Sequence, residues 1–133
     1  MTTINRKTRL FTDLNLLFTA HPVTADINKK VDEEAVKASL KNLLSTRHYE
    51  RPFHPEIGCQ IYSLLFENYT TITRQIMKKT IYDVIEKFEP RIEVLEIIIQ
   101  DRPDNNSIDL DVIFKIINND RPITLRTAIS RIR

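Results

Sequence analysis

Glycine is almost absent from this chain: Gly58 is the only one among 133 residues, whereas average usage is about 7%. Phosphate-binding loops and dinucleotide fingerprints need several glycines at fixed spacings, because the backbone must approach a phosphate closely. The scarcity of glycine therefore excludes P-loop and Rossmann-type nucleotide chemistry.

Cysteine and long apolar runs are scarce as well. The single Cys59 cannot form a disulfide within the chain, and the N-terminus does not pair a basic region with an apolar run of signal-peptide length. The longest apolar runs are a few residues long, far below the roughly 20 that a membrane-spanning helix needs. We therefore expect a soluble protein with no membrane partner, assembled in a reducing, intracellular compartment.

A net charge of one sign is also lacking. The 20 lysine and arginine residues stand against 18 acidic ones, which leaves a formal net charge of +2. No strong overall field draws such a chain to nucleic acid. We predict that nucleic acid is not a partner.

The chain does have enough apolar material for one core, since 41% of its 133 residues are hydrophobic. We predict an extended N-terminal arm and loop over residues 1–31, with a polar, basic start over residues 1–9. Apolar alternation over residues 10–18 predicts an extended segment, and His21-Pro22 favours a loop. A single α+β domain is expected over residues 32–133.

Apolar residues recur at helical spacing in three places. The first helix is predicted from Asp32 to about Thr46, with acidic residues in its first turn and a stripe of Val36, Leu40, Leu43 and Leu44. A loop with two prolines over residues 47–58 precedes a short helix around Ile61, Leu64, Leu65 and Phe66. The strongest pattern predicts a helix from Thr71 to Phe88, capped by Thr70 or Thr71, with an apolar face of Ile72, Ile76, Met77, Ile81, Val84, Ile85 and Phe88.

After Arg91 the apolar period changes from helical spacing to two, which predicts strands. The expected inward faces are Leu95, Ile97 and Ile99, then Ile108, Leu110, Val112, Phe114 and Ile116, then Ile123, Leu125 and Ile129. Turn compositions over residues 104–107 and 118–120 separate the three segments. The sequence therefore predicts an α+β fold in which two to three helices pack on a three-stranded antiparallel meander at the C-terminal end.

The tripeptide Glu89-Pro90-Arg91 stands where helix changes to sheet. Proline ends a helix and fixes the backbone, so the two charged side chains are held at a rigid corner. Such a corner is either a structural elbow or a display point for a partner. Arg91 can bind a partner's carboxylate in a bidentate manner, while Glu89 can accept from a partner or hold Arg91 in place.

Catalytic and metal sites find little support in the residue pattern. Glu56, Glu67 and Glu89 could be the paired carboxylates of a glycosidase, but no local pattern distinguishes a buried acid from a nucleophile. The set formed by His21, His48, His54 and Cys59 matches no zinc spacing. We predict no catalytic residue, no metal, no cofactor and no small-molecule substrate.

Four arginines follow near the C-terminus, namely Arg121, Arg126, Arg131 and Arg133. They could contact phosphate, or they could keep a terminal edge strand soluble. A third interpretation is strand addition, in which a partner's segment extends the sheet and the arginines select that partner.

Three short motifs in order resemble one known family. They are the stretch from Arg51-Pro52-Phe53 to Gly58, the stretch Leu65-Phe66-Glu67-Asn68, and Glu89-Pro90-Arg91 followed by Ile92. With weaker support from Phe11-Thr12-Asp13-Leu14, the chain resembles the baseplate wedge and sheath-initiator proteins of contractile phage tails, type VI secretion systems and phage-derived particles. Residues 32–133 carry the resemblance, and members are often labelled lysozyme-like.

The resemblance implies a non-enzymatic structural subunit of the virion tail baseplate, assembled in the host cytoplasm. It implies docking on the core-bundle proteins of the wedge through Glu89, Pro90 and Arg91, with Arg51 and Pro52 as further partner-binding residues. It also implies that a strand from about Ile123 to Ile132 initiates the tail sheath by pairing with the sheath protein. Ile123, Leu125, Arg126 and Ile129 are the expected strand-addition residues. The alternative is a peptidoglycan-degrading muramidase of the tail.

Overall fold

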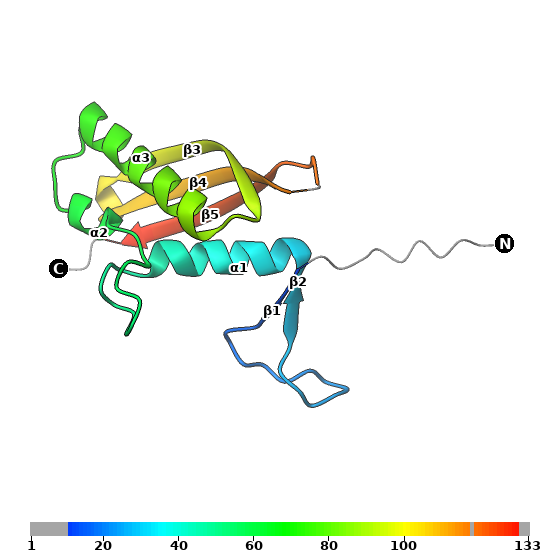
Figure 1. The fold of residues 1–133 in the computed structure, drawn as a ribbon. Helices are drawn as coiled ribbons and strands as arrows, with labels where there is room; N and C mark the ends of the chain where they lie inside the picture. The colour runs from blue at the N-terminus through cyan, green and yellow to red at the C-terminus, as the bar shows by residue number, and fades with distance from the viewer. Residues whose placement is uncertain (1–10, 118, 131–133) are drawn as a thin grey trace. The chain divides into compact units, whose positions relative to one another are not determined.

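The computed structural model describes residues 11–117 and 119–130, whose elements are drawn in Figure 1. Their contacts divide them into two compact units, one up to Ala38 and one from Ser39 onward. The predicted basic start over residues 1–9 lies outside the described residues. The predicted boundary between residues 31 and 32 stays a prediction.

The first unit contains a two-stranded hairpin. Strand β1 (Thr12–Leu14) pairs antiparallel with β2 (Lys29–Val31), and an isolated bridge joins Ala20 to Ile27 in the loop between them. The predicted extended segment over residues 10–18 is thus a strand of three residues followed by a loop. Many apolar side chains of this loop are exposed, because a hairpin this small has no face on which to bury them: Leu16, Leu17, Phe18 and Val23.

Helix α1 (Asp32–Ser45) matches the predicted bounds. Its predicted stripe is buried, consisting of Val36, Leu40, Leu43 and Leu44. Three acidic side chains occupy the first turn, where they complement the positive end of the helix dipole. The Asp32 Oδ1 atom accepts a hydrogen bond from the Phe11 backbone N–H at 3.2 Å.

Helix α2 (Ile61–Leu64) and helix α3 (Thr71–Phe88) also form where predicted. Thr70 caps α3, since its hydroxyl accepts from the Thr73 backbone N–H at 3.2 Å. The predicted apolar face of α3 is wrong at Ile72 and Ile76, which are 71% and 47% exposed. The buried stripe is instead Thr73, Met77, Ile81 and Ile85. Each exposed isoleucine precedes a residue of this stripe by one position, about 100° around the helix.

The sheet is the predicted three-stranded antiparallel meander, in the order β3-β4-β5. Strand β3 (Ile92–Arg102) leads through a short 3₁₀ turn (Pro103–Asn105) into β4 (Ser107–Ile116), and β5 (Ile123–Ser130) follows. Asn106 closes the first turn in the left-handed region at φ 49°. The second turn closes with the Asn119 N–H on the Ile116 carbonyl. The α+β fold class is confirmed.

One face of this sheet forms a core with α2 and α3, and α3 contacts β3 (Figure 1). Inward side chains of the strands meet α2 and α3 around a residual cavity of about 10 Å³, lined by Ile61, Met77, Ile81, Ile99, Ile108, Leu110 and Ile129. A void of this size does not comfortably hold a water molecule. The sheet and these two helices therefore share one close-packed core.

Leu95 is the one predicted inward residue of β3 that the sheet does not bury, since it is 51% exposed. The register with β4 shifts between Val94 and Glu96, which pair with Phe114 and Ile113. Leu95 is therefore the extra residue of a β-bulge, which turns its side chain out of the alternation. Apolar alternation alone cannot locate such an insertion.

Candidate functional site

The Glu89-Pro90-Arg91 corner ends helix α3. The Glu89 backbone N–H donates to the Ile85 carbonyl at 2.8 Å, and Glu89 leaves the helical conformation at φ −129° and ψ 72°. Pro90 cannot continue the helix, and β3 begins two residues later at Ile92. The tripeptide thus lies where the chain changes from helix to sheet, as the sequence predicts.

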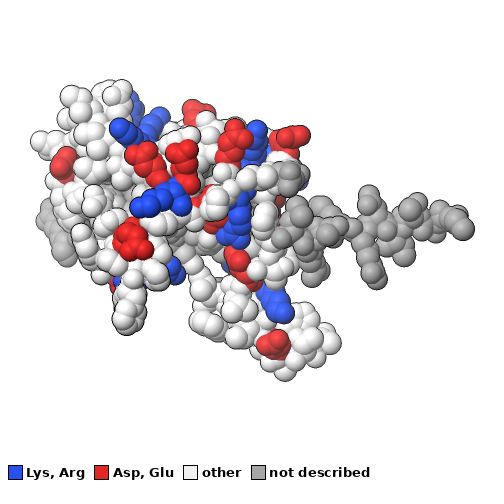
Figure 2. Space-filling view, viewed as in Figure 1, with Lys and Arg blue, Asp and Glu red and all other residues white. Residues whose placement is uncertain are grey.

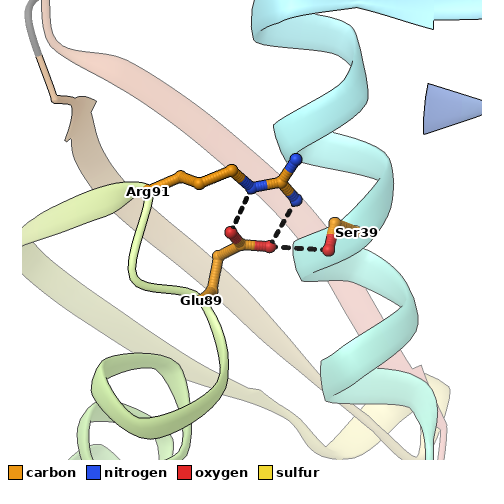
Figure 3. A network of polar contacts seen from close by, with 3 residues as sticks. All are labelled: Ser39, Glu89 and Arg91. Carbon is orange, nitrogen blue, oxygen red and sulfur yellow. Dashed lines mark hydrogen bonds and ion pairs between the residues drawn. The ribbon is translucent and has the colours of Figure 1, made fainter. Parts of the chain in front are cut away.

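Both carboxylate oxygens of Glu89 are engaged within the chain, as Figure 3 shows. The Arg91 Nε atom donates to Oε1 at 2.5 Å, and a terminal guanidinium nitrogen donates to Oε2 at 2.8 Å. The Ser39 hydroxyl donates to Oε2 at 2.6 Å from helix α1. Glu89 is only 3% exposed, so its carboxylate is available to Arg91 rather than to a partner. Arg91 is 23% exposed and reaches the surface.

The environment of Glu89 also determines its protonation. Burial alone would raise the pKa of this carboxyl, but hydrogen bonds from Arg91 and Ser39 and the Arg91 charge hold the pKa below its ordinary value. The carboxylate is therefore charged at neutral pH. We refer to Ser39, Glu89 and Arg91 as the corner clamp.

The loop over residues 47–58, which contains Arg51, lies beside the corner clamp. A pocket of about 190 Å³ is lined by Ser39, Asn42, Leu43, Thr46, Arg51, Ile57 and Phe88. This pocket brings Arg51 next to Ser39 and to the last residue of α3, although these residues are far apart in the sequence. Arg51 and Pro52 are themselves exposed. Arg51 therefore lines one pocket with Ser39, the residue of α1 that binds Glu89.

The backbone of this loop is held in unusual conformations. Tyr49 and Phe53 adopt positive φ angles of 65° and 69°, which bulky residues rarely do. Gly58 has φ 140°, and a Cβ atom there would lie 2.7 Å from the Arg47 carbonyl oxygen. Glycine is thus required at position 58, and the Cys59 N–H closes the loop on the Thr46 carbonyl at 2.8 Å.

The sequence analysis does not single out Ser39, and it names Phe53 only as part of the Arg51-Pro52-Phe53 motif. Ser39 is separated by 50 positions from the carboxylate it binds, so no local pattern reveals the pair. Phe53 is 96% exposed in the loop over residues 47–58. An aromatic residue between two prolines is the one signal that could have drawn attention to it.

The predicted strand-addition residues lie on β5, which is an edge of the sheet. Ile123, Leu125 and Ile129 are buried, whereas Arg126 is exposed on the opposite face. The Arg126 Nε atom lies 3.6 Å from Asp111 on β4. The continuation of this strand toward Ile132 lies outside the described residues.

The hydrogen-bond register shows which residues of β5 face away from β4. The Ile117 N–H donates to the Arg91 carbonyl at 3.0 Å, and backbone groups along a strand point alternately to its two sides. The backbone groups of Ile117 and of the odd-numbered residues of β4 therefore bond to the β3 side. The backbone groups of the even-numbered residues of β4 bond to β5. These even-numbered residues of β4 pair with odd-numbered residues of β5, as Val112 does with Leu125.

The even-numbered residues of β5 consequently direct their backbone groups to the outer side. These residues are Thr124, Arg126, Ala128 and Ser130, and all four side chains are exposed. Among the described residues, no strand pairs with this side. We refer to it as the β5 edge.

The other predicted candidates are scattered. Glu56 is exposed next to His54, with 3.3 Å between a carboxylate oxygen and Nδ1. Its pKa is lowered, first by its own backbone hydrogen bond and then by His54, while desolvation acts in the opposite direction. Glu67 is exposed, and burial raises the pKa of the Cys59 thiol to about 11. No group of three or more His, Cys, Asp or Glu side chains among the described residues could hold a metal ion.

Charge on the surface is mixed in sign. Figure 2 shows lysine and arginine side chains interspersed with acidic ones over the visible face. Of the four predicted arginines, Arg121 and Arg126 are exposed, and Arg131 and Arg133 lie outside the described residues. No helix of the described chain is long and apolar enough to cross a bilayer.

Comparison with known proteins identifies relatives at the level of sequence. The family model for the baseplate wedge protein gp25 matches residues 30–121. The baseplate wedge protein gp25 of Enterobacteria phage T4 is 31% identical over 94 residues, which are 71% of this chain and 71% of the T4 protein.

Solved structures share the fold at lower identity. A Geobacter sulfurreducens chain that is called a tail lysozyme has a TM-score of 0.70 at 22% identity, over 76% of this chain and 92% of its own. A chain of the anti-feeding prophage baseplate has a TM-score of 0.64 at 21% identity, over 92% and 87%. A chain of the postcontracted pyocin R2 baseplate has a TM-score of 0.54 at 13% identity, over 84% and 96%.

The family model and the T4 relative define the class of protein, a structural component of a contractile-tail baseplate. Within this class, the chain belongs to the family of the baseplate wedge protein gp25. The resemblance predicted from the three motifs is confirmed.

Proposed function

We propose that this chain is a non-enzymatic subunit of the baseplate wedge that docks on wedge core-bundle proteins and initiates the tail sheath by strand addition. The observation that carries the sheath role is the β5 edge. Thr124, Arg126 and Ala128 direct backbone donors and acceptors outward from an unbroken register with β4. An open edge of this kind accepts a partner strand through main-chain hydrogen bonds.

The faces of the sheet support a specific kind of added strand. Leu125 and Ile129 are 8% and 7% exposed on the inner side of β5, so an added strand can bury alternate apolar residues beside them. Arg126 stands on the outer side with its side chain 83% exposed. A sheath strand that pairs here would alternate apolar residues with polar ones, and an acidic side chain would face Arg126.

Docking on the wedge core is proposed for Arg91 together with Arg51 and Pro52. The corner clamp supports this proposal, because Glu89 fixes the Arg91 side chain before any partner arrives, and less ordering entropy is then lost on binding. Glu89 itself is buried, so its proposed part is to position Arg91. The exposed ring of Phe53, two residues after Arg51, offers an apolar contact to the same partner.

The experiment for the sheath role replaces one outward-facing residue. Ala128→Pro removes a backbone donor from the β5 edge and places a proline ring there, which an edge strand tolerates. Ala128→Val is the matched control, because it adds bulk and keeps the N–H. We expect purified sheath subunits of the same tail to polymerise with the wild type and with Ala128→Val, and to fail with Ala128→Pro. Equal nucleation by the two variants contradicts strand addition.

Muramidase activity is the competing function, favoured by the name of the Geobacter sulfurreducens chain. A glycosidase needs a general acid whose pKa is raised. The pKa values of Glu56 and Glu89 are lowered instead, which supports a structural role. We expect no clearing of purified peptidoglycan by the chain. Clearing that is lost in Glu56→Gln or Glu67→Gln contradicts the non-enzymatic proposal.

A further inference from the structure

We propose that the groove between α3 and the bulge of β3 is a third docking surface, which takes an apolar residue flanked by an acidic residue from a neighbouring baseplate protein. The groove has a volume of about 350 Å³. Lys78, Lys79 and Tyr82 line it from α3, and Leu95 and Glu96 line it from β3. None of these residues belongs to the corner clamp or to the β5 edge.

The bulge gives the groove its apolar floor. Val94 pairs with the inward Phe114, and Glu96 pairs with the outward Ile113. These two residues therefore keep the inward–outward alternation of β3, and Leu95 is the residue inserted between them. Leu95 adds nothing to the core and is 51% exposed in the groove, next to Tyr82 at 44%. Bulges are known to redirect a side chain toward a site of function. An aliphatic and an aromatic side chain are therefore presented together, ready to pack on an apolar residue of a partner.

Charge decides which partner fits. Two lysines and one glutamate line the groove, so one positive charge remains after the glutamate is counted. Among the described residues, neither Lys78 nor Lys79 forms an ion pair with an acidic side chain. An acidic side chain on the partner complements them, whereas a basic one is repelled. A nucleic acid is disfavoured, because Glu96 and the apolar floor oppose a phosphate backbone.

The inference relies on the proposed baseplate role only to place the partner in the same particle. The test introduces the photo-cross-linking residue p-benzoylphenylalanine in place of Tyr82, where an aromatic ring already stands, and assembles the full baseplate with this variant. Asp83 is the matched control position, because it is exposed on the same helix one residue away. Mass spectrometry identifies the cross-linked segment.

We expect the probe at position 82 to cross-link one segment of another baseplate protein, with an acidic residue within two positions of an apolar one. The Asp83 probe should not cross-link that segment. Adding Lys78→Glu with Lys79→Glu should lower the cross-linked yield about tenfold or more, because like charges then face each other. The melting temperature of the isolated double variant should stay close to that of the wild type, since neither lysine forms an ion pair with another residue that the structure describes.

Three results would overturn the inference. They are an incorporated probe with no cross-link to another protein, a cross-linked segment without an acidic residue, and a yield that the lysine variants do not change. If position 82 does not accept the probe, the same probe at Leu95 must give the same segment. The Ala128→Pro chain carrying the probe at position 82 should still cross-link, so failure at the groove is distinguishable from failure at the β5 edge.

Discussion

The corner clamp and the β5 edge differ in whether their polar groups find partners among the described residues. At the corner, both oxygens of Glu89 are bound by Arg91 and Ser39 inside the chain. At the edge, the backbone groups of Thr124, Arg126 and Ala128 find no strand among the described residues. The difference teaches that substitutions at the corner should affect folding as well as assembly, whereas outward changes at the edge should affect assembly far more than folding.

The largest expected effect lies within β5 itself. Thr127 directs its N–H to β4, so Thr127→Pro should cost about 3 kcal/mol or more through a lost ladder bond and strain. Ala128→Pro, one residue further, should cost about 1 kcal/mol or less, because its N–H faces outward. Chemical denaturation of the two isolated variants measures the difference. Similar losses at both positions would show that the register assigned to β5 is wrong.

The corner should show the next largest effect on folding. Arg91→Ala leaves the buried Glu89 carboxylate without its guanidinium partner and should lower the free energy of unfolding by about 2 to 3 kcal/mol. Arg126→Ala is the control, because its ion pair with Asp111 is long and exposed and should contribute at most about 0.5 kcal/mol. Unfolding in urea provides the comparison. A loss at Arg91 no larger than at Arg126 would mean that the clamp does not stabilise the fold.

The pH dependence of stability should follow from the same carboxylate. The pKa of Glu89 in the folded state lies below its ordinary value of 4.5, so the folded state binds this proton less readily than the unfolded state. The stabilisation is therefore present above pH 4.5 and is lost as the pH falls through the folded-state pKa. Arg91→Ala should flatten this acid limb in melting curves recorded from pH 7 downward. An unchanged acid limb would mean that other carboxyls control it.

The smallest effect on folding is expected at Arg51, which is exposed beside the clamp. Arg51→Glu should change the free energy of unfolding by at most about 0.5 kcal/mol. Incorporation into the baseplate should nevertheless fall strongly, because a charge on the proposed docking surface is reversed. Co-purification with wedge proteins measures incorporation, with Arg74→Glu on α3 as the matched charge reversal. Normal incorporation of the Arg51 variant would remove this loop from the docking surface.

Much of the fold follows from local pattern. Helix α3 begins and ends at the predicted residues because its cap at Thr70 and its stop at Pro90 are both local signals. The meander follows from apolar alternation and two polar turns. The bulge at Leu95 does not, because an inserted apolar residue among apolar neighbours leaves the pattern of β3 almost unchanged.

The functional surfaces are predictable only in part. Glu89-Pro90-Arg91 is conspicuous as a tripeptide, but the burial of Glu89 depends on Ser39, which lies 50 positions away. The open side of β5 follows from a hydrogen bond between Ile117 and Arg91, which no sequence pattern specifies. Contacts of this range arise from tertiary packing, so sequence periodicity cannot reveal them.

The central claim is that the even-numbered residues of β5 face a partner strand. Amide hydrogen exchange, measured by NMR or mass spectrometry, tests it directly. In the free chain, the amides of Thr124, Arg126 and Ala128 should exchange fast and those of Leu125 and Thr127 slowly. After assembly with sheath subunits, the first three should become protected. Fast exchange at Thr124, Arg126 and Ala128 in the assembled state would contradict strand addition at β5.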